Sequence, residues 1–164
     1  GVGELLIKGD GVMKGYYRNA TATAEALPFK GVFRSGDLGR IDADGTVYVE
    51  GRVKELIIRN GFNVYPPEIE AMLTRHEKVL QAAVVPRRDG ANEEILAFVM
   101  ALDGLTESAL AAWLRPRLVA YKQPQHILIV DGFPVAPTGK VLKHKLISHF
   151  AEMLALREGK QKNG

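Results

Sequence analysis

The spacing of hydrophobic positions changes along the chain and divides it into two parts. Up to residue 52, apolar residues occur in short runs between glycine and aspartate turns, which predicts strands over 3–8, 33–40 and 46–50. Residues 21–27 offer only one or two helical turns, too few to cover those strands. Because a few strands without a covering layer bury little apolar surface, we expect residues 1–52 to be the β-rich edge of a larger domain.

Strands alternate with amphipathic helices after residue 52. The pattern predicts strands over 53–58, 79–85, 95–102 and 126–130. It also predicts three helices: one that begins at Pro66, one over 106–118 and one over 143–156. Pro66 and Pro67 suit the first helical turn, and Glu68 suits the positive end of the helix dipole. Residues 159–164 form a polar tail that we expect to fray. The alternation predicts a compact α+β domain over residues 53–164.

Composition narrows the classes of protein. Hydrophobic residues make up 46% and charged residues 25% of the 164 residues, which is typical of a globular protein. The net charge of +3 is small and dispersed, so it does not indicate nucleic-acid binding. Cysteine is absent from the sequence, which excludes a disulfide framework and favours the cytoplasm. HExxH and Cys/His clusters are also absent, so we expect no metal site.

Targeting signals are not evident either. The longest apolar run, residues 95–102, is too short to span a bilayer, and the N-terminus lacks the pattern of a signal peptide. The chain starts without Met inside a predicted strand. We interpret this start as a piece cut from a longer chain.

Four motifs carry groups suited to nucleotide chemistry, although each alone also fits an ordinary turn or surface position. Asp37, on the glycine turn of FRSGDLGR, can accept hydrogen bonds from the two hydroxyls of a ribose. Arg52 can bind a phosphate. Gly61 precedes a helix start and allows the backbone to approach a ligand closely. Lys140, in PTGK, can bring one positive charge to a phosphate, but the segment is not a P-loop because Val141 replaces the required Ser or Thr.

Taken together and in their order along the chain, the segments that contain these motifs resemble the adenylate-forming superfamily of acyl-CoA synthetases, luciferases and peptide-synthetase adenylation domains. FRSGDLGRIDADGTVYVEGRVKELI resembles the ribose-binding and hinge segment, GFNVYPPEIE the start of the C-terminal domain, and YKQPQHILIVDGFPVAPTGKVLKHKL the terminal lysine motif. The resemblance implies a small C-terminal lid domain with a mixed sheet and helices over 53–164. The β-rich remnant of a large AMP-binding N-terminal domain over 1–52 would precede it.

The resemblance also implies roles for individual residues. Asp37 would bind the ribose hydroxyls of ATP or AMP, and Arg52 would reach the ribose and phosphate side. Lys54 would be the hinge of the lid. Lys140 would stabilise charge on the α-phosphate during adenylation. Rotation of the lid would then withdraw Lys140 and bring Gly61 to line the channel for the thiol of coenzyme A.

The implied parent is an ATP-dependent acid–CoA ligase that forms an acyl-adenylate and then a thioester, with Mg²⁺ accompanying ATP. A fatty or aromatic acid is expected, which suggests fatty acid metabolism, and homo-oligomerisation is left open. The partner would be the N-terminal domain that carries the phosphate loop and acyl pocket, so we expect this chain alone to be inactive. The sequence departs from the family at Glu55 and Asn63 and in the segment with Arg87 and Arg88. The alternatives are a non-catalytic, lid-like interaction module, or part of a luciferase-like or peptide-synthetase enzyme.

Overall fold

The computed structural model describes residues 1–161, with side chains described up to residue 157. The chain divides into two compact units, Gly1–Leu56 and Ile57–Gly164. The division falls after Leu56, whereas the sequence predicted a boundary after Arg52. None of the helices within residues 1–161 has the length and apolar character needed to cross a lipid bilayer.

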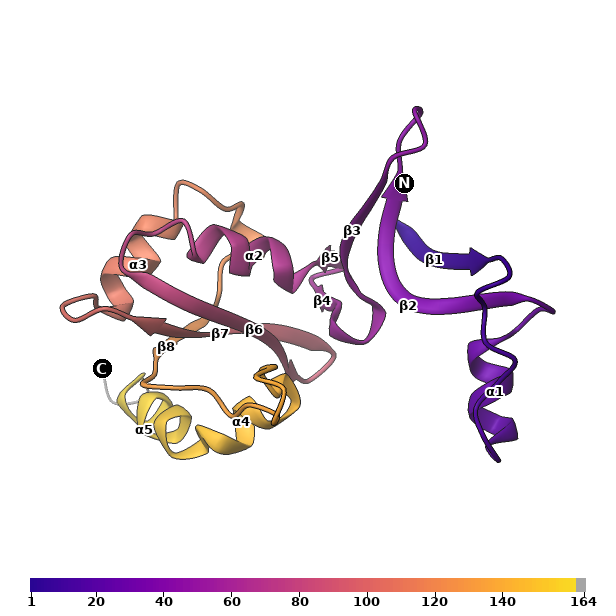
Figure 1. The fold of residues 1–164 in the computed structure, drawn as a ribbon. Coiled ribbons are helices and arrows are strands. Elements are labelled where there is room, and N and C mark those ends of the chain that lie inside the picture. The colour runs from indigo at the N-terminus through magenta and orange to yellow at the C-terminus, as the bar shows by residue number, and fades with distance from the viewer. Residues whose placement is uncertain (162–164) are drawn as a thin grey trace. The chain divides into compact units, whose positions relative to one another are not determined.

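The first unit is an antiparallel sheet with one short helix beside it. Its strands are β1 (Gly3–Lys8), β2 (Val32–Ile41) and β3 (Val47–Arg52), in the order β1-β2-β3. Helix α1 spans Ala20–Ala26 and starts where the Asn19 side chain accepts a hydrogen bond from Ala22 N at 2.9 Å. Figure 1 shows β2 bending strongly between its two neighbours.

The first unit has little core. Within residues 1–56, no hydrophobic residue is buried, and the buried positions are Gly39 and Gly51. Glycine is required at position 39 because a Cβ there would lie 2.5 Å from the Tyr48 carbonyl oxygen. The exposed large hydrophobic residues of this unit include Leu6, Ile7, Phe29, Ile41, Val47 and Val49. The three strands therefore leave much apolar surface open to solvent.

The second unit is built on a mixed sheet. A short 3-10 turn, η1 (Val53–Glu55), precedes the unit boundary. The strands that follow are β4 (Ile57–Arg59), β5 (Phe62–Val64), β6 (Val79–Asp89), β7 (Asn92–Ala101) and β8 (His126–Ile129). The helical segments are α2 (Pro66–Leu73), α3 (Glu107–Leu114), η2 (Ala120–Lys122), η3 (Lys143–Lys145), α4 (Leu146–His149) and α5 (Ala151–Gln161). In the sheet β6-β7-β8, β7 runs antiparallel to β6 and parallel to β8.

Both faces of the sheet are covered, which explains the unbroken apolar run in β7. Successive strand residues point to opposite faces: Ile95 and Ala97 join the cluster under α2 and α3, while Leu96 and Phe98 join the cluster over α4 and α5. All four are completely buried. Figure 1 shows these two helical layers on either side of the sheet.

Three predicted elements differ from the structure. The strand expected over 53–58 is wrong, because 53–55 forms the η1 turn and β4 begins only at Ile57. The single helix expected over 143–156 is interrupted at Phe150, whose ring stacks on Phe98 at 5.3 Å. Helix α3 stops at Leu114 instead of Leu118. Of the predicted tail, helix α5 takes in residues up to Gln161, and 162–164 lie outside the described residues.

Glutamate side chains close both outer edges of the sheet, where strands expose unpaired backbone groups. At the β6 edge, Glu70 Oε1 accepts a hydrogen bond from Val84 N at 2.7 Å and forms an ion pair with Lys143 Nζ at 2.8 Å. At the β8 edge, Glu107 accepts from Ile129 N at 3.1 Å and pairs with Arg157. Each pair links a helix on one face to a helical segment on the other.

Candidate functional site

The two residues predicted to bind the nucleotide face each other across β2 and β3. Asp37 and Arg52 are partners in the strand register, and they form an ion pair in which Arg52 Nε lies 2.9 Å from Asp37 Oδ1. Their side chains are 30% and 60% exposed, respectively. An ion pair this open to water contributes at most about 1 kcal/mol to stability, so its value lies in holding a carboxylate and a guanidinium together at the surface.

Backbone conformation and hydrogen bonds define the turn that carries Asp37. Gly36 has a φ of +73°, in the left-handed region that favours glycine. Ser35 Oγ accepts a hydrogen bond from Asp37 N at 3.0 Å and donates to Leu5 O at 2.8 Å. Ser35 therefore ties this turn to β1.

Lys54 lies in the η1 turn between β3 and β4, with an exposed side chain. It is in the first unit, just before the division between Leu56 and Ile57. The predicted hinge residue thus lies beside the boundary between the two compact parts of the chain.

Gly61 sits at the tip of the β4–β5 hairpin. Asn60 and Gly61 both have positive φ, 51° and 79°, as a two-residue type I′ hairpin turn requires. A Cβ on Gly61 would meet no atom within 4 Å. Glycine is thus favoured here by backbone conformation, and the space around Gly61 within this chain is open.

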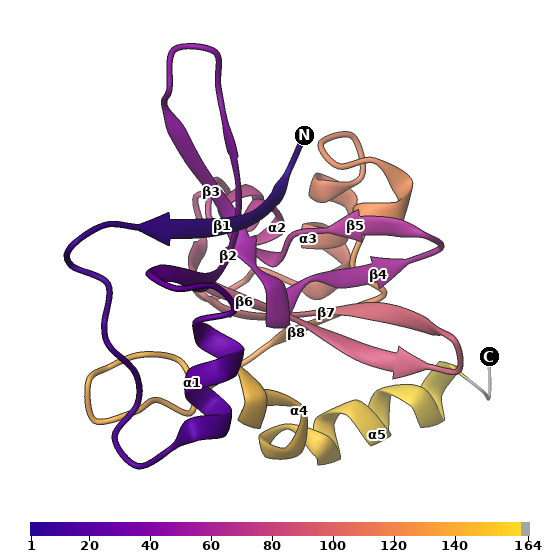
Figure 2. The ribbon, with the colours of Figure 1, turned by 90° about the vertical axis from the view of Figure 1, so that its right-hand side faces the viewer.

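Contacts on both sides of this turn hold the hairpin to the rest of the second unit. Arg59 Nη1 donates to Gln123 O at 3.1 Å, and the ring of Phe62 stacks on Tyr121 with centroids 4.5 Å apart. Partial burial lowers the pKa of Arg59, but a guanidinium stays protonated at neutral pH. Figure 2 shows β4 beside β7, with β5 on the far side of β4.

Lys140 is presented by a tight hairpin between β8 and η3. Ala136 N donates to Lys140 O and Gly139 N donates to Ala136 O, both at 2.8 Å. Gly139 has a φ of +83°, and Val135 bridges to Val141 beyond the turn. This is the geometry of a three-residue hairpin loop that ends in a left-handed glycine. The Lys140 side chain is exposed.

The structure brings Asp37 and Arg52 together and puts Gly61 and Lys140 on separate loops of the second unit. Sequence reasoning missed Ser35, whose hydroxyl binds the backbone N–H of Asp37, although its position two residues upstream is a common place for such a turn contact. It also missed Glu70, which anchors Lys143 just after the Lys140 hairpin. No local pattern signals that contact, because it joins residues far apart in the chain.

Arg87, in the segment where the sequence departs from the family, has a structural role. It donates to Glu94 Oε2 at 2.9 and 2.6 Å, and its Nη2 lies 3.2 Å from His126 Nε2. Since an arginine can only donate, His126 carries its proton on Nδ1 in this arrangement. Arg87 thus ties β6, β7 and β8 together, while Arg88 is exposed.

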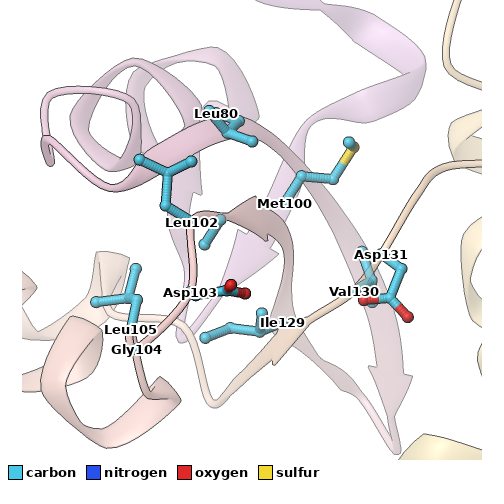
Figure 3. A pocket seen from close by; sticks show the side chains of 10 residues that line it. Leu80, Met100, Leu102, Asp103, Gly104, Leu105, Ile129, Val130 and Asp131 are labelled. Atoms are coloured by element: carbon cyan, nitrogen blue, oxygen red, sulfur yellow. The ribbon is translucent and has the colours of Figure 1, made fainter.

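A hollow of about 260 Å³ opens at the end of the sheet away from Arg87 (Figure 3). Leu80, Met100 and Leu102 line it together with Asp103 and Asp131. None of the predicted site residues lines it. Among the described residues, no group of three or more His, Cys, Asp or Glu side chains is arranged to hold a metal ion.

Comparison with known proteins places this geometry in a family. Residues 68–140 match the family described as AMP-binding enzyme C-terminal domain. The chain is 41% identical to 4-coumarate–CoA ligase 5 of Oryza sativa subsp. japonica, over 91% of this chain and 28% of that protein. It is 42% identical to sulfoacetate–CoA ligase of Cupriavidus necator, over 90% of this chain and 30% of that protein.

Solved structures agree. ATP-bound MatB from Rhodopseudomonas palustris superimposes with a TM-score of 0.84 and 33% identity, covering 93% of this chain and 31% of that one. The o-succinylbenzoate CoA synthetase from Bacillus subtilis, solved with its acyl-adenylate intermediate, gives 0.82 and 31% identity, covering 89% and 30%.

These matches define the class as an AMP-binding enzyme C-terminal domain within an α+β fold. The chain belongs to the adenylate-forming superfamily and corresponds to the C-terminal portion of its members. It spans less than a third of the length of the relatives named here.

Proposed function

We propose that this chain supplies the C-terminal part of an ATP-dependent acid–CoA ligase. In the first half-reaction a carboxylate oxygen attacks the α-phosphorus of ATP, the bond to the β-phosphate breaks, and pyrophosphate leaves. In the second, the thiol sulfur of coenzyme A attacks the acyl carbon, the bond from that carbon to AMP breaks, and the thiol gives up its proton. The products are the acyl-CoA thioester, AMP and pyrophosphate.

The observation that carries the proposal is the Asp37–Arg52 pair, held 2.9 Å apart yet exposed. A carboxylate fixed in this way can accept hydrogen bonds from ribose hydroxyls, and the neighbouring guanidinium can contact phosphate oxygens. A solvent-exposed ion pair on a strand adds little stability. We therefore assign the pair a role in nucleotide binding instead of in stability.

Lys140 and Gly61 serve the two half-reactions in turn. The hairpin that carries Lys140 is rigidly hydrogen-bonded and leaves the ammonium group exposed, which suits a charge that must reach the α-phosphate. Gly61 lies on a different loop with open space around it, which suits a wall of the thiol channel. Lys54, beside the unit boundary, is the proposed hinge for exchanging the two loops.

Residues 1–52 are proposed to be the edge of the large AMP-binding domain. The support is the apolar surface of the first unit, where Leu6, Ile7 and Phe29 are at least half exposed, at 55%, 50% and 66%. Such a surface is unusual for an independent domain and is expected where more protein packs against it. The partner would be the preceding part of the same chain.

The acid is proposed to be aromatic or fatty. The relatives named for 4-coumarate favour an aromatic acid, while the acyl pocket would lie outside these residues. Mg²⁺ would enter as the counter-ion of ATP. The cytoplasmic location and self-association stay predictions.

Carboxylate-dependent exchange of pyrophosphate into ATP by the full-length enzyme tests the proposal. We expect exchange in the unmodified enzyme and a loss of about 100-fold or more in Lys140→Ala, the scale seen when one charge-stabilising group is removed. Lys145→Ala is the matched control, since Lys145 is also exposed and lies just beyond the same hairpin. Equal activity in the two variants would contradict the role of Lys140, and absence of exchange in the unmodified enzyme would contradict the ligase itself.

A further inference from the structure

A reciprocal pair of asparagines fastens the Gly61 turn to the main sheet. Asn60 N donates to Asn92 Oδ1 at 2.9 Å, and Asn92 Nδ2 donates to Asn60 Oδ1 at 2.8 Å. One side chain therefore grips both the backbone and the side chain of the residue that precedes Gly61.

The next residue on β7 reinforces this attachment. Glu93 Oε2 accepts a hydrogen bond from Ile58 N at 2.7 Å. Asn92 and Glu93 begin β7, whose following residues Ile95 and Leu96 are completely buried. The turn is thus fastened to the first residues of a strand whose middle is completely buried.

The attachment also opposes a local strain. Asn60 has a φ of 51°, a left-handed conformation that costs free energy for any residue except glycine. Asparagine tolerates it better than most residues because its side chain can hydrogen-bond nearby. Here the bond is to Asn92, so this contact holds both turn residues, Asn60 and Gly61, in the conformation that shapes the tip.

We infer that Asn92 is a positioning residue for the second half-reaction: through Asn60 it sets the place of the Gly61 turn against the incoming thiol. This inference rests on the proposed function. Lys140, which serves the first half-reaction, is on a separate hairpin whose downstream end is anchored by the Lys143–Glu70 pair. Loss of Asn92 therefore affects thiol transfer and leaves adenylation intact.

The test separates the half-reactions in the full-length enzyme. The acyl-adenylate is formed on the enzyme first and then mixed with coenzyme A in a quench-flow experiment. Asn92→Ala is expected to slow thioester formation about tenfold, the scale of a lost hydrogen-bonded pair, with pyrophosphate exchange unchanged. Asn92→Asp keeps the acceptor for Asn60 N but lacks the donor, so it should fall between. Gln81→Ala, an exposed amide on β6 of the same hairpin, is the matched control.

Amide hydrogen exchange in the 164-residue chain gives a second readout that does not depend on catalysis. The amide of Asn60 should exchange about tenfold faster in Asn92→Ala, while the amides of β7 stay protected. Unchanged exchange at Asn60, an unchanged thioester rate, or an equal loss in both half-reactions would overturn the inference. Absence of pyrophosphate exchange in the unmodified enzyme would overturn the proposed function itself, whatever the amide result.

Discussion

Replacing Glu70 with alanine should destabilise the second unit more than any comparable change on the same helix. Glu70 Oε1 accepts from Val84 N at 2.7 Å and pairs with Lys143 at 2.8 Å. Val84 is completely buried, so removal of the carboxylate leaves a backbone N–H without its acceptor and Lys143 without this partner.

The magnitude follows from these two contacts. A buried donor left unsatisfied costs about 1–3 kcal/mol. The ion pair, with side chains 24% and 20% exposed, adds at most about 1 kcal/mol. We therefore expect Glu70→Ala to lower the free energy of unfolding by about 2–3 kcal/mol. Glu70→Gln retains an acceptor for Val84 N and should lose about 1 kcal/mol.

Urea titration of the 164-residue chain, followed by tryptophan fluorescence, measures this change. The chain has one tryptophan, Trp113 in α3, so the signal reports on the second unit. The control is Glu68→Ala on the same helix: Glu68 pairs with Lys122 at 2.7 Å and its side chain is 44% exposed. The control should cost about 1 kcal/mol or less. Equal losses for the two alanine variants would refute the assignment of the Val84 contact.

Two further changes test the sheets. Gly39→Ala should loosen β2 from β3 and lower the free energy of unfolding by about 1–3 kcal/mol, because the new Cβ would lie 2.5 Å from Tyr48 O. Limited proteolysis should then cleave the β2–β3 hairpin faster. An unchanged cleavage rate would count against the close approach of Gly39 to Tyr48. Arg157→Ala should cost about 1–2 kcal/mol by removing the partner of Glu107 and a donor to a β8 carbonyl. The same fluorescence titration measures that loss, and a midpoint equal to that of the unmodified chain would contradict it.

The sequence was most informative where structure depends on the local pattern of residues. The run from Ile95 to Leu102 predicted a strand, and burial on both faces explains why it does not alternate. Asn60-Gly61 is a pair typical of a type I′ turn, because few other pairs accept positive φ at both positions. The α+β class followed from the order of these elements.

Strand pairings that depend on irregular backbone could not be predicted from the sequence. The hairpin register that starts at Ile41 and Val47 would place Asp37 opposite Gly51, but a bulge after Leu38 shifts it so that Asp37 faces Arg52. The strand predicted from Val53 failed for a similar reason, since a 3-10 turn replaces its first residues. Bulges and short turns depend on packing, not on hydrophobic period.

Contacts between distant segments were equally hidden. Asn60 and Asn92 meet only because β4 lies beside β7, and Glu70 meets Lys143 only because both reach the same sheet edge. Nothing in either local segment indicates its partner.

Product analysis of the full-length enzyme with an aromatic acid, ATP and coenzyme A tests the central claim most directly. The account predicts that acyl-CoA thioester and AMP form in equal amounts, with pyrophosphate as the other product. Formation of ADP and phosphate, or a product in which the acyl group is joined to an amine but never to coenzyme A, would contradict it.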